Sequence, residues 1–325
     1  MKRSLTGIKP TGTIHVGNYL GAMLPALRLL EQHDSSLYFI ADYHALTTVH
    51  DRGQLHTMVY DVAAAWLAVG LDPERTLLYR QSAVTEVFEL AWVLSCLIAT
   101  GQLERGHAYK DALTRGEAPN AGIFNYPVLM AADIVLYDAN AVPVGQDQRQ
   151  HLEVARDVAN RVNHVFGAGT LVVPEPVIQA EVLVPGLDGQ KMSKSHGNVI
   201  PLFASQKELK KVVMSIVSSG EALEAPKEPD GTTLFALFKH VASAADAEAL
   251  ASKLRAGGYG WGHAKLDLLA ALEAQLAPLR ARYLTLRADE AALDRLLEAG
   301  AARARTIARA TMERVRDATG IALRK

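Results

Sequence analysis

Short apolar segments alternate with amphipathic ones throughout residues 1–200, and this alternation constrains the fold more than any other feature. Apolar runs typical of strands occupy residues 4–8, 37–41, 76–80 and 141–145. Helical periodicity occupies residues 18–32, 54–69, 86–98 and 127–137, and another helix is expected after Asp147. Strands that alternate with helices predict an α/β fold with a parallel, doubly wound sheet and right-handed crossovers.

The pattern changes after Pro201, where strand signals stop and alanine- and leucine-rich helical periodicity replaces them. The expected helices span residues 207–217, 233–242, 265–286, 291–299 and 301–318. Two prolines and a glycine in residues 221–231 predict an exposed linker. We therefore expect two domains, an α/β catalytic domain at 1–200 and an all-helical domain at 201–325.

Charge and cysteine content exclude several classes of protein. The net charge is −1, so a nucleic-acid site would have to be a local patch. The last 25 residues hold seven basic side chains against two acidic ones, which predicts either such a patch or an ordinary solvated helix face. The single cysteine, Cys96, excludes a disulfide framework, and its apolar neighbours predict a buried thiol. With neither an apolar leader nor a membrane-spanning run, we expect a cytoplasmic protein without a membrane partner.

Five residues between Gly189 and Gly197 form a cationic loop: Lys191-Met192-Ser193-Lys194-Ser195. Lysine is a compact charge on a flexible stem, and serine hydroxyls donate hydrogen bonds. This chemistry suits the polyphosphate of a nucleotide, because the lysines can neutralise charge that develops on departing pyrophosphate. The alternative is a solvated surface loop.

A second candidate phosphate loop follows the first strand, where Gly12, Gly17 and Gly21 lead into a helix. Glycines permit close approach to a ligand, and a helix amino terminus favours phosphate. His15 and Asn18 can donate hydrogen bonds to phosphate oxygens. The spacing matches neither the dinucleotide fingerprint nor the P-loop. In the alternative interpretation, Thr13 or Asn18 caps the helix and His15 is a surface histidine.

Tyr126, Met130 and Asp133 share one face of the helix expected to begin at Pro127. Asp133 follows two alanines, so we expect it to have room and few local partners. An indole N–H is only a donor, and a carboxylate in an apolar pocket would accept it. A structural carboxylate that caps a neighbouring backbone group is the alternative. Asp147 is expected to cap the helix that follows it.

Several of these segments resemble known signatures. Residues 10–22, with His15-Val-Gly-Asn18, resemble the HIGH signature of class I aminoacyl-tRNA synthetases. Residues 191–195 resemble the KMSKS signature of the same class and match it at every position. Residues 18–22, 130–133 and 144–151 resemble the tryptophanyl branch. The similarity runs from Gly7 to the carboxyl terminus and includes residues 257–260. The whole chain therefore resembles bacterial tryptophanyl-tRNA synthetases.

The resemblance implies ATP-dependent attachment of L-tryptophan to tRNA(Trp) through a tryptophanyl-adenylate, with AMP and pyrophosphate as the other products. It implies a Rossmann-like catalytic domain, a homodimer formed through a helical insertion around residues 86–98 that includes Trp92, and an anticodon-binding role for residues 201–325. Mg²⁺ is expected to be held mainly by the phosphates of ATP, because no dense carboxylate cage is present, and no protein metal ligand is expected.

The resemblance also assigns site residues. Catalytic roles fall to Thr11, His15, Asn18, Lys191 and Lys194. The ATP contacts are Lys9, Pro10, Thr11, Gly17, Asn18, Gly145, Gln146, Asp147, Val182, Lys191, Met192, Ser193, Lys194 and Ser195. The tryptophan contacts are Leu5, His44, Tyr126, Met130, Asp133, Val142, Val144 and Gln148.

Two positions depart from the family pattern. Leu5 stands where relatives often carry an aromatic residue. Ala112 stands where they carry a lysine that holds ATP phosphates, and Lys110 lies two residues earlier.

Two other functions stay open. One is a tyrosine-specific sister synthetase, and the other is a paralogue that no longer charges tRNA and acts as a binding or regulatory module. A phenol would require a second polar partner deep in the pocket, so Met130 beside Asp133 favours indole. The presence of both signatures favours an active enzyme.

Overall fold

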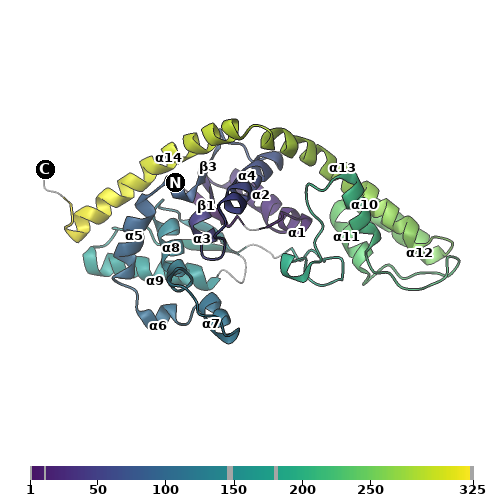
Figure 1. Cartoon of the computed structure of the whole chain (residues 1–325), viewed down its shortest axis with the longest axis horizontal. Coiled ribbons are helices and arrows are strands. Elements are labelled where there is room, and N and C mark those ends of the chain that lie inside the picture. Colours follow the sequence, from purple (N-terminus) through teal and green to yellow (C-terminus); the bar gives the residue numbers. More distant parts are fainter. Residues whose placement is uncertain (1, 11, 145–148, 179–181, 323–325) are drawn as a thin grey trace.

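The computed structural model describes residues 2–10, 12–144, 149–178 and 182–322. The molecule is elongated, with a sheet and its helices at one end and helices α10, α11 and α12 at the other (Figure 1). One long helix, α14, crosses above the sheet.

The sheet has the predicted parallel, doubly wound arrangement. Its strands follow the order β3-β2-β1-β4-β5, and every pair is parallel. Their bounds are β1 (Arg3–Ile8), β2 (Ser35–Ile40), β3 (Thr76–Arg80), β4 (Ala141–Val144) and β5 (Glu175–Ile178). Sequence analysis missed β5, which has four residues and includes a proline and an exposed glutamate at its start.

Successive residues of β2 face opposite sides of the sheet and enter two separate cores. Tyr38 and Ile40 pack with α2 (Leu24–Leu29), α4 (Arg52–Ala68) and the helical region. Leu37 and Phe39 pack with α5 (Glu86–Ser95), α8 (Ala121–Val135) and α9 (Arg149–Phe166). The sheet is therefore covered on both faces, as its near-continuous apolar strands require.

The first helical run is interrupted. It comprises α1 (Val16–Asn18), the π-helical η1 (Tyr19–Met23), α2 and the 3₁₀-helical η2 (Leu30–Gln32). The predicted start of α8 at Pro127 is wrong. Asn120 caps this helix, since its Oδ1 accepts a hydrogen bond from the N–H of Ile123 at 2.9 Å, and Pro127 lies inside it.

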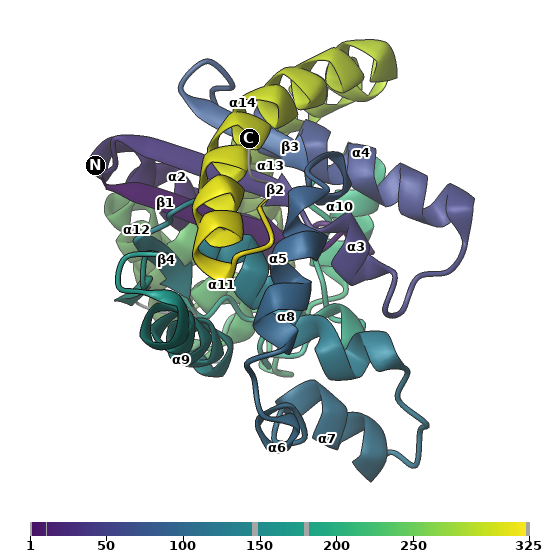
Figure 2. The same cartoon turned by 90° about the vertical axis from the view of Figure 1, so that its left-hand side faces the viewer.

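Short helices lie in the connections between the longer elements, and Figure 2 labels α3, α6 and α7 among them. They are α3 (Asp42–Ala45), η3 (Gln81–Ala83), α6 (Thr100–Leu103) and α7 (His107–Thr114). Helix α5 buries Val87, Leu90 and Leu94. Its opposite face leaves Phe88 and Trp92 exposed. Cys96 directly follows the helix, four residues after Trp92, and it is also exposed. The predicted burial of its thiol is therefore wrong.

The helical region contains α10 (Gln206–Met214), α11 (Thr233–Val241), α12 (Ala244–Ala256), α13 (Trp261–Arg287) and α14 (Glu290–Thr319). Sequence analysis missed α12. It also divided α14 at Gly300, which lies within the helix. A Cβ at Gly300 would lie 2.1 Å from the carbonyl oxygen of Leu78, so this glycine permits close approach to a strand rather than ending the helix.

Helix α14 returns to the α/β part of the molecule, which corrects the expected division at residue 201 for this last helix. Ala304, Ala308 and Met312 enter the same core as Leu77 and Tyr79 of β3. The helix covers the edge strand β3 and continues past α5 (Figures 1 and 2). An exposed strand edge is a template for unwanted pairing, and α14 protects it.

Four arginines of α14 form ion pairs within the chain. Arg309 pairs with Glu86, Arg314 with Asp138 and Arg316 with Glu89. Arg305 pairs with Glu298 and also donates to the carbonyl oxygen of Ala83. These four side chains attach the helix to the sheet region, so neither a free basic patch nor an ordinary solvated face describes them.

The expected linker at 221–231 is only partly exposed. Lys227 is buried, and its Nζ donates to the carbonyl oxygens of Ala222, Leu223 and Ala225. These bonds explain how a lysine is accommodated inside the protein.

Candidate active site

A cavity of about 530 Å³ opens beside β1, β2 and β4. Ligands of parallel α/β sheets commonly bind near the carboxyl ends of strands, where side chains of several elements meet. Six of the eight predicted tryptophan contacts line this cavity: Leu5, His44, Tyr126, Met130, Asp133 and Val142. Gln148 lies outside the described residues, as does the side chain of Val144.

Asp133 lies in the wall of this cavity and is only 2% exposed. Gln81 Nε2 donates to its two carboxylate oxygens, at 2.9 and 2.8 Å. His44 Nε2 lies 2.9 Å from Oδ2. The partners of Asp133 thus come from distant parts of the chain, in keeping with the expectation of few local partners.

The same contacts determine the electrostatics of Asp133. Burial raises the pKa of its carboxyl above the ordinary value, while the bonds from His44 and Gln81 oppose that rise. A carboxylate oxygen has two lone pairs, so an anchored Asp133 can accept a further hydrogen bond from a ligand. The cavity walls beside it are largely apolar, which suits a flat ring with one N–H donor.

Sequence reasoning missed Gln81. It lies in η3 directly after β3 and is almost fully buried. A polar residue just beyond the carboxyl end of a parallel strand is the signal that could have identified it. His151, which lines the cavity with its Nε2 2.9 Å from the Tyr126 hydroxyl, was also not assigned a role. Burial, followed by the charge of Asp111, raises the pKa of Tyr126.

His15 caps the helix that follows the glycine loop, whereas Thr13 and Asn18 do not. Its Nδ1 accepts from the N–H of Asn18 at 3.3 Å, and its own N–H donates to Asn18 Oδ1 at 3.2 Å. His15 is 5% exposed, so it is not a surface histidine. Burial, and then the charge of Lys194, lower its pKa to about 4. The ring is therefore neutral near pH 7 and keeps its proton on Nε2, as a donor.

The lysine loop, residues 191–195, contacts the glycine loop although the two are far apart in sequence. The N–H of Gly17 donates to Met192 Sδ at 3.1 Å. Gly12 has a positive φ of 57°, and a Cβ there would lie 3.1 Å from Cδ of Lys194. Partial burial lowers the pKa of Lys194. The two candidate phosphate loops thus form one continuous surface.

The backbone that follows the lysine loop strengthens this junction. The N–H of Val16 donates to the carbonyl oxygen of Ile200, and that of Leu202 donates to Ile14, each at 2.9 Å. Lys9 Nζ donates to Thr47 Oγ1 at 3.0 Å, and burial lowers its pKa. Lys9 also lines the Asp133 cavity, and in sequence it lies between β1 and the glycine loop.

The remaining predicted ATP contacts differ in their exposure, and some of them lie outside the described residues. Pro10 is buried next to Lys9, Lys191 is exposed, and the hydroxyls of Ser193 and Ser195 lie 2.8 Å apart. Val182 is exposed, and its carbonyl oxygen lies close to Gly21 of the first helical run. Thr11, Gly145, Gln146 and Asp147 lie outside the described residues, so the predicted cap at Asp147 stays a prediction.

Helix α7 brings Ala108, Asp111 and Arg115 to the cavity. Ala112 of this helix is fully buried, and Lys110 is exposed. Within the described part of the chain, Lys110 therefore does not line the cavity.

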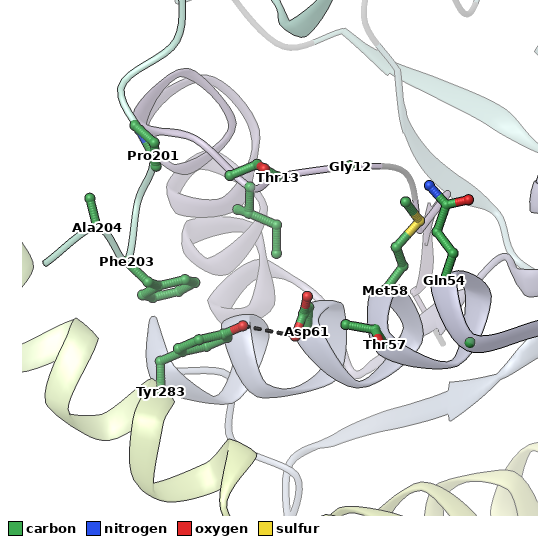
Figure 3. A pocket seen from close by; sticks show the side chains of 12 residues that line it. Gly12, Thr13, Gln54, Thr57, Met58, Asp61, Pro201, Phe203, Ala204 and Tyr283 are labelled. Carbon is green, nitrogen blue, oxygen red and sulfur yellow. Dashed lines mark hydrogen bonds between the residues drawn. The ribbon is translucent and has the colours of Figure 1, made fainter. Parts of the chain in front are cut away.

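A second cavity, of about 500 Å³, lies behind the glycine loop (Figure 3). Gln54, Thr57, Met58 and Asp61 of α4 form one wall, and Tyr283 of α13 faces them. The Tyr283 hydroxyl donates to Asp61 at 2.9 Å, and Phe203 stacks on Tyr283 with ring centroids 3.9 Å apart. These contacts join α13 to α4 and to the segment that leaves the lysine loop.

Metal-binding clusters and membrane-spanning helices are two further features that bear on function. No group of three or more His, Cys, Asp or Glu residues in the described ranges is arranged to hold a metal ion. Among the described helices, none is long and apolar enough to cross a membrane.

Comparisons with known proteins identify the family of this chain. Residues 2–277 match the family model for class I tRNA synthetases (W and Y). A tryptophan–tRNA ligase of Neisseria meningitidis is 45% identical, over 98% of each chain. One of Xanthomonas axonopodis pv. citri is also 45% identical, over 98% of this chain and 76% of the relative.

Solved structures give the same result. Tryptophanyl-tRNA synthetase of Campylobacter jejuni, crystallised with ADP and tryptophan, superposes with a TM-score of 0.94. It is 40% identical, and the match covers 98% of this chain and 99% of that one. The chain belongs to the class I tRNA synthetases of the tryptophan and tyrosine group and, within it, to the tryptophan–tRNA ligases.

Proposed function

We propose that the protein activates L-tryptophan with ATP and transfers it to tRNA(Trp). In the first step a carboxylate oxygen of tryptophan attacks the α-phosphorus of ATP, the bond to the β-phosphate breaks, and pyrophosphate leaves. In the second step a hydroxyl of the terminal adenosine of tRNA attacks the tryptophanyl carbonyl, and AMP leaves. The observation that carries this proposal is the Asp133 cavity beside β1, the strand that leads into the glycine loop, which Met192 in turn joins to the lysine loop.

Asp133 is proposed to select the substrate. Its carboxylate accepts the indole N–H, while Leu5, Met130 and Val142 provide an apolar surface for the ring. A buried carboxylate without a donor is costly, and the ligand would supply one. The tyrosine alternative is less favoured, because a phenol would require a second polar partner deep in the pocket, and the apolar side chain of Met130 lines the cavity together with Asp133.

The two loops are proposed to bind the phosphates. Lys191 and Lys194 would offset the negative charge that grows on pyrophosphate as it leaves. The Nε2–H of neutral His15 and the amide of Asn18 would donate to phosphate oxygens. Lys9, at the junction, would contact ATP between the amino acid and the phosphates. Because this reaction depends on positioning and charge stabilisation, it requires no nucleophilic side chain.

We propose that Mg²⁺ accompanies ATP and is held mainly by phosphate oxygens. Lys191, Lys194, His15 and Asn18 of the two loops supply cations and neutral donors, and Mg²⁺ commonly binds through substrate phosphates. The ion would offset part of the phosphate charge.

The helical region at 201–325, apart from α14, is proposed to contact the tRNA anticodon arm. Four arginines of α14 are paired within the chain, whereas α10 carries three exposed lysines, Lys207, Lys210 and Lys211. Charge reversal of Lys207 and Lys211 should weaken tRNA charging and reduce its salt dependence while pyrophosphate exchange survives. Lys2→Glu, at an exposed lysine directly before β1, is the control. Equal losses in both variants would contradict this assignment.

A homodimer through α5 is also proposed. Trp92 is 72% exposed and lies beside exposed Phe88, which is unusual for large aromatic residues on a monomer surface. Trp92→Glu should shift the mass measured by light scattering from dimer to monomer, and an unchanged mass would place the interface elsewhere. The cytoplasm, where ATP and tRNA are both present, is the proposed compartment.

The decisive experiment measures ATP–pyrophosphate exchange with tryptophan and with tyrosine, followed by charging of tRNA(Trp). Exchange and charging with tryptophan alone are expected. Lys194→Ala should lower the exchange rate constant by about two orders of magnitude with little change in tryptophan affinity, whereas Lys2→Ala should have no effect. Exchange that prefers tyrosine would indicate the sister enzyme, and absence of charging would indicate the regulatory paralogue.

A further inference from the structure

Behind the lysine loop lies a buried carboxamide that none of the proposed steps uses. Asn198 is 3% exposed and follows the lysine loop by three residues. Its Oδ1 accepts the N–H of Ser193 at 2.8 Å. Its Nδ2 donates to Asp188 Oδ1 at 2.7 Å and to the carbonyl oxygen of Lys191 at 3.2 Å. The one side chain thus bonds to both neighbours of Met192 and to the turn that precedes the loop.

The surrounding chain is shaped to hold this carboxamide. A Cβ at Gly186 would lie 2.3 Å from Cγ of Asn198, so any larger residue there would displace the amide. The N–H of Leu187 donates to the Asn198 carbonyl oxygen at 2.9 Å. The turn at Gly186–Gln190 and the lysine loop are therefore packed around Asn198.

The bonds of Asn198 have a direct geometric consequence for the loop. By fixing the Lys191 carbonyl and the Ser193 N–H, they determine the orientation of the residue between them. Met192 then reaches Gly17 with its sulfur, and its own N–H donates to the carbonyl oxygen of Val184 at 2.9 Å. Lys194 lies two residues after Met192, and its side chain lies against Gly12.

We propose that Asn198 is a positioning residue, which holds the lysine loop in the conformation that places Lys194 at the phosphate site. It acts through Lys194 and does not itself contact the substrate. The inference rests on the proposed role of the lysine loop in adenylate formation. Displacement of a charge-stabilising group by about 1 Å can slow a reaction a hundredfold, so a buried amide can control the rate from behind the loop.

The acceptor Asp188 makes the hypothesis testable by exchange of partners. The bond from Asn198 is the main cause that lowers the pKa of the Asp188 carboxyl, so this acceptor is ionised at neutral pH. Asn198→Asp keeps the side-chain shape and an acceptor for Ser193, but it places two carboxylates in contact. Asp188→Asn in the same chain restores an amide–carboxylate pair with donor and acceptor exchanged.

The experiment measures ATP–pyrophosphate exchange, with separate rate constants and KM values for ATP and tryptophan, together with thermal unfolding. Asn198→Asp is expected to lower the rate constant between about tenfold and a hundredfold, with a smaller change in the KM for tryptophan. Asp188→Asn should change it by less than about threefold, because an amide oxygen still accepts. The double variant should recover part of the lost activity, because the pair between residues 188 and 198 is restored while the bond to the Lys191 carbonyl oxygen stays absent.

A matched control is available in Asn163, whose amide bonds to the backbone of Leu171 at 2.8 and 2.9 Å, away from the loops. Asn163→Asp should leave exchange unchanged. Normal exchange in folded Asn198→Asp, or no recovery in the double variant, would overturn the proposal. If Lys194→Ala exchanges normally, the proposed function of the loop itself fails. If Lys194→Ala is impaired and Asn198→Asp is not, only the role of Asn198 fails.

Discussion

The N–H of Gly17 donates to the sulfur of Met192 across 3.1 Å, and this contact joins the first helix to the lysine loop. Met192 is buried at the junction. Sulfur is a weak acceptor, so the side chain contributes mainly by packing and shape. Met192 therefore determines where the lysine loop rests on the first helix.

Truncation of Met192 should loosen this contact. Met192→Ala is expected to lower the pyrophosphate-exchange rate constant by about tenfold, because a cavity frees the loop. Met192→Leu, which keeps most of the volume, should lose only a few-fold. The same exchange to leucine at partly exposed Met214 of α10 is the control. Wild-type turnover in Met192→Ala would show that the contact does not position the loop.

Gln81 should be required for tryptophan binding although it need not touch the ligand. Gln81→Leu removes the donors to both oxygens of Asp133 and leaves only the bond from His44. The KM for tryptophan should rise by about tenfold or more, measured by exchange. Gln102→Leu removes a similar Gln–Asp bond, to Asp157 outside the cavity, and should have no effect. Equal KM values in the two variants would exclude a role for Gln81.

Asp133 should discriminate between tryptophan and its benzothiophene analogue, which lacks the ring N–H. Asp133→Ala is expected to reduce the preference for tryptophan by about tenfold or more, since the indole donor loses its acceptor. Asp133→Asn keeps an acceptor oxygen and should retain more of the preference. The measurement is the ratio of exchange efficiencies for the two substrates. An unchanged ratio in Asp133→Ala would remove the main physical support for the selection of indole by this residue.

The stability of the protein should fall with acid partly because of His15. Its pKa is about 4 when folded, against 6.5 ordinarily, so between these values the unfolded chain binds a proton that the folded chain does not. Stability that depends on neutral His15 is present above pH 6.5 and is lost as the pH falls toward 4. In urea unfolding at pH 7 and 4.5, His15→Gln should show a smaller loss than wild type. Exposed His164→Gln is the control, and identical pH dependence in all three proteins would contradict the prediction.

The packing of α14 on β3 can be tested at Gly300. Gly300→Ala introduces a Cβ at 2.1 Å from the Leu78 carbonyl oxygen, and it should lower the free energy of unfolding by roughly 1–3 kcal/mol. Gly262→Ala, in α13 with open space around it, should be neutral or stabilise by about 0.5–1 kcal/mol. Denaturant unfolding measures both. A stabilised Gly300→Ala would mean that α14 does not approach β3 so closely.

Much of the architecture could be predicted from local pattern. Apolar runs predicted four of the five strands, and β3 has the predicted bounds. The face of α8 that carries Tyr126, Met130 and Asp133 also follows from helical spacing, although the predicted start of the helix is wrong. These features depend on neighbours within a few residues, so their information is present in each segment.

Other features depend on contacts between distant segments. Gly300 was interpreted as a break because glycine disfavours an isolated helix, whereas its approach to Leu78 makes it necessary inside one. Cys96 was expected to be buried because its neighbours are apolar, yet α5 places it on the exposed face. In both cases the local sequence pattern is present, but the structure that forms depends on how the segment packs against another element.

The candidate site divides in the same way. Local sequence pattern was sufficient to predict the two signature loops, the carboxylate at Asp133 and the alternating α/β fold that could bring them together. Three sets of contacts could be identified only in the folded molecule. They are the hydrogen bonds of Gln81 and His44 to Asp133, of Gly17 to Met192, and of Asn198 to the lysine loop. Local periodicity is encoded residue by residue, but hydrogen-bond partners far apart in sequence are selected by how the sheet and helices pack.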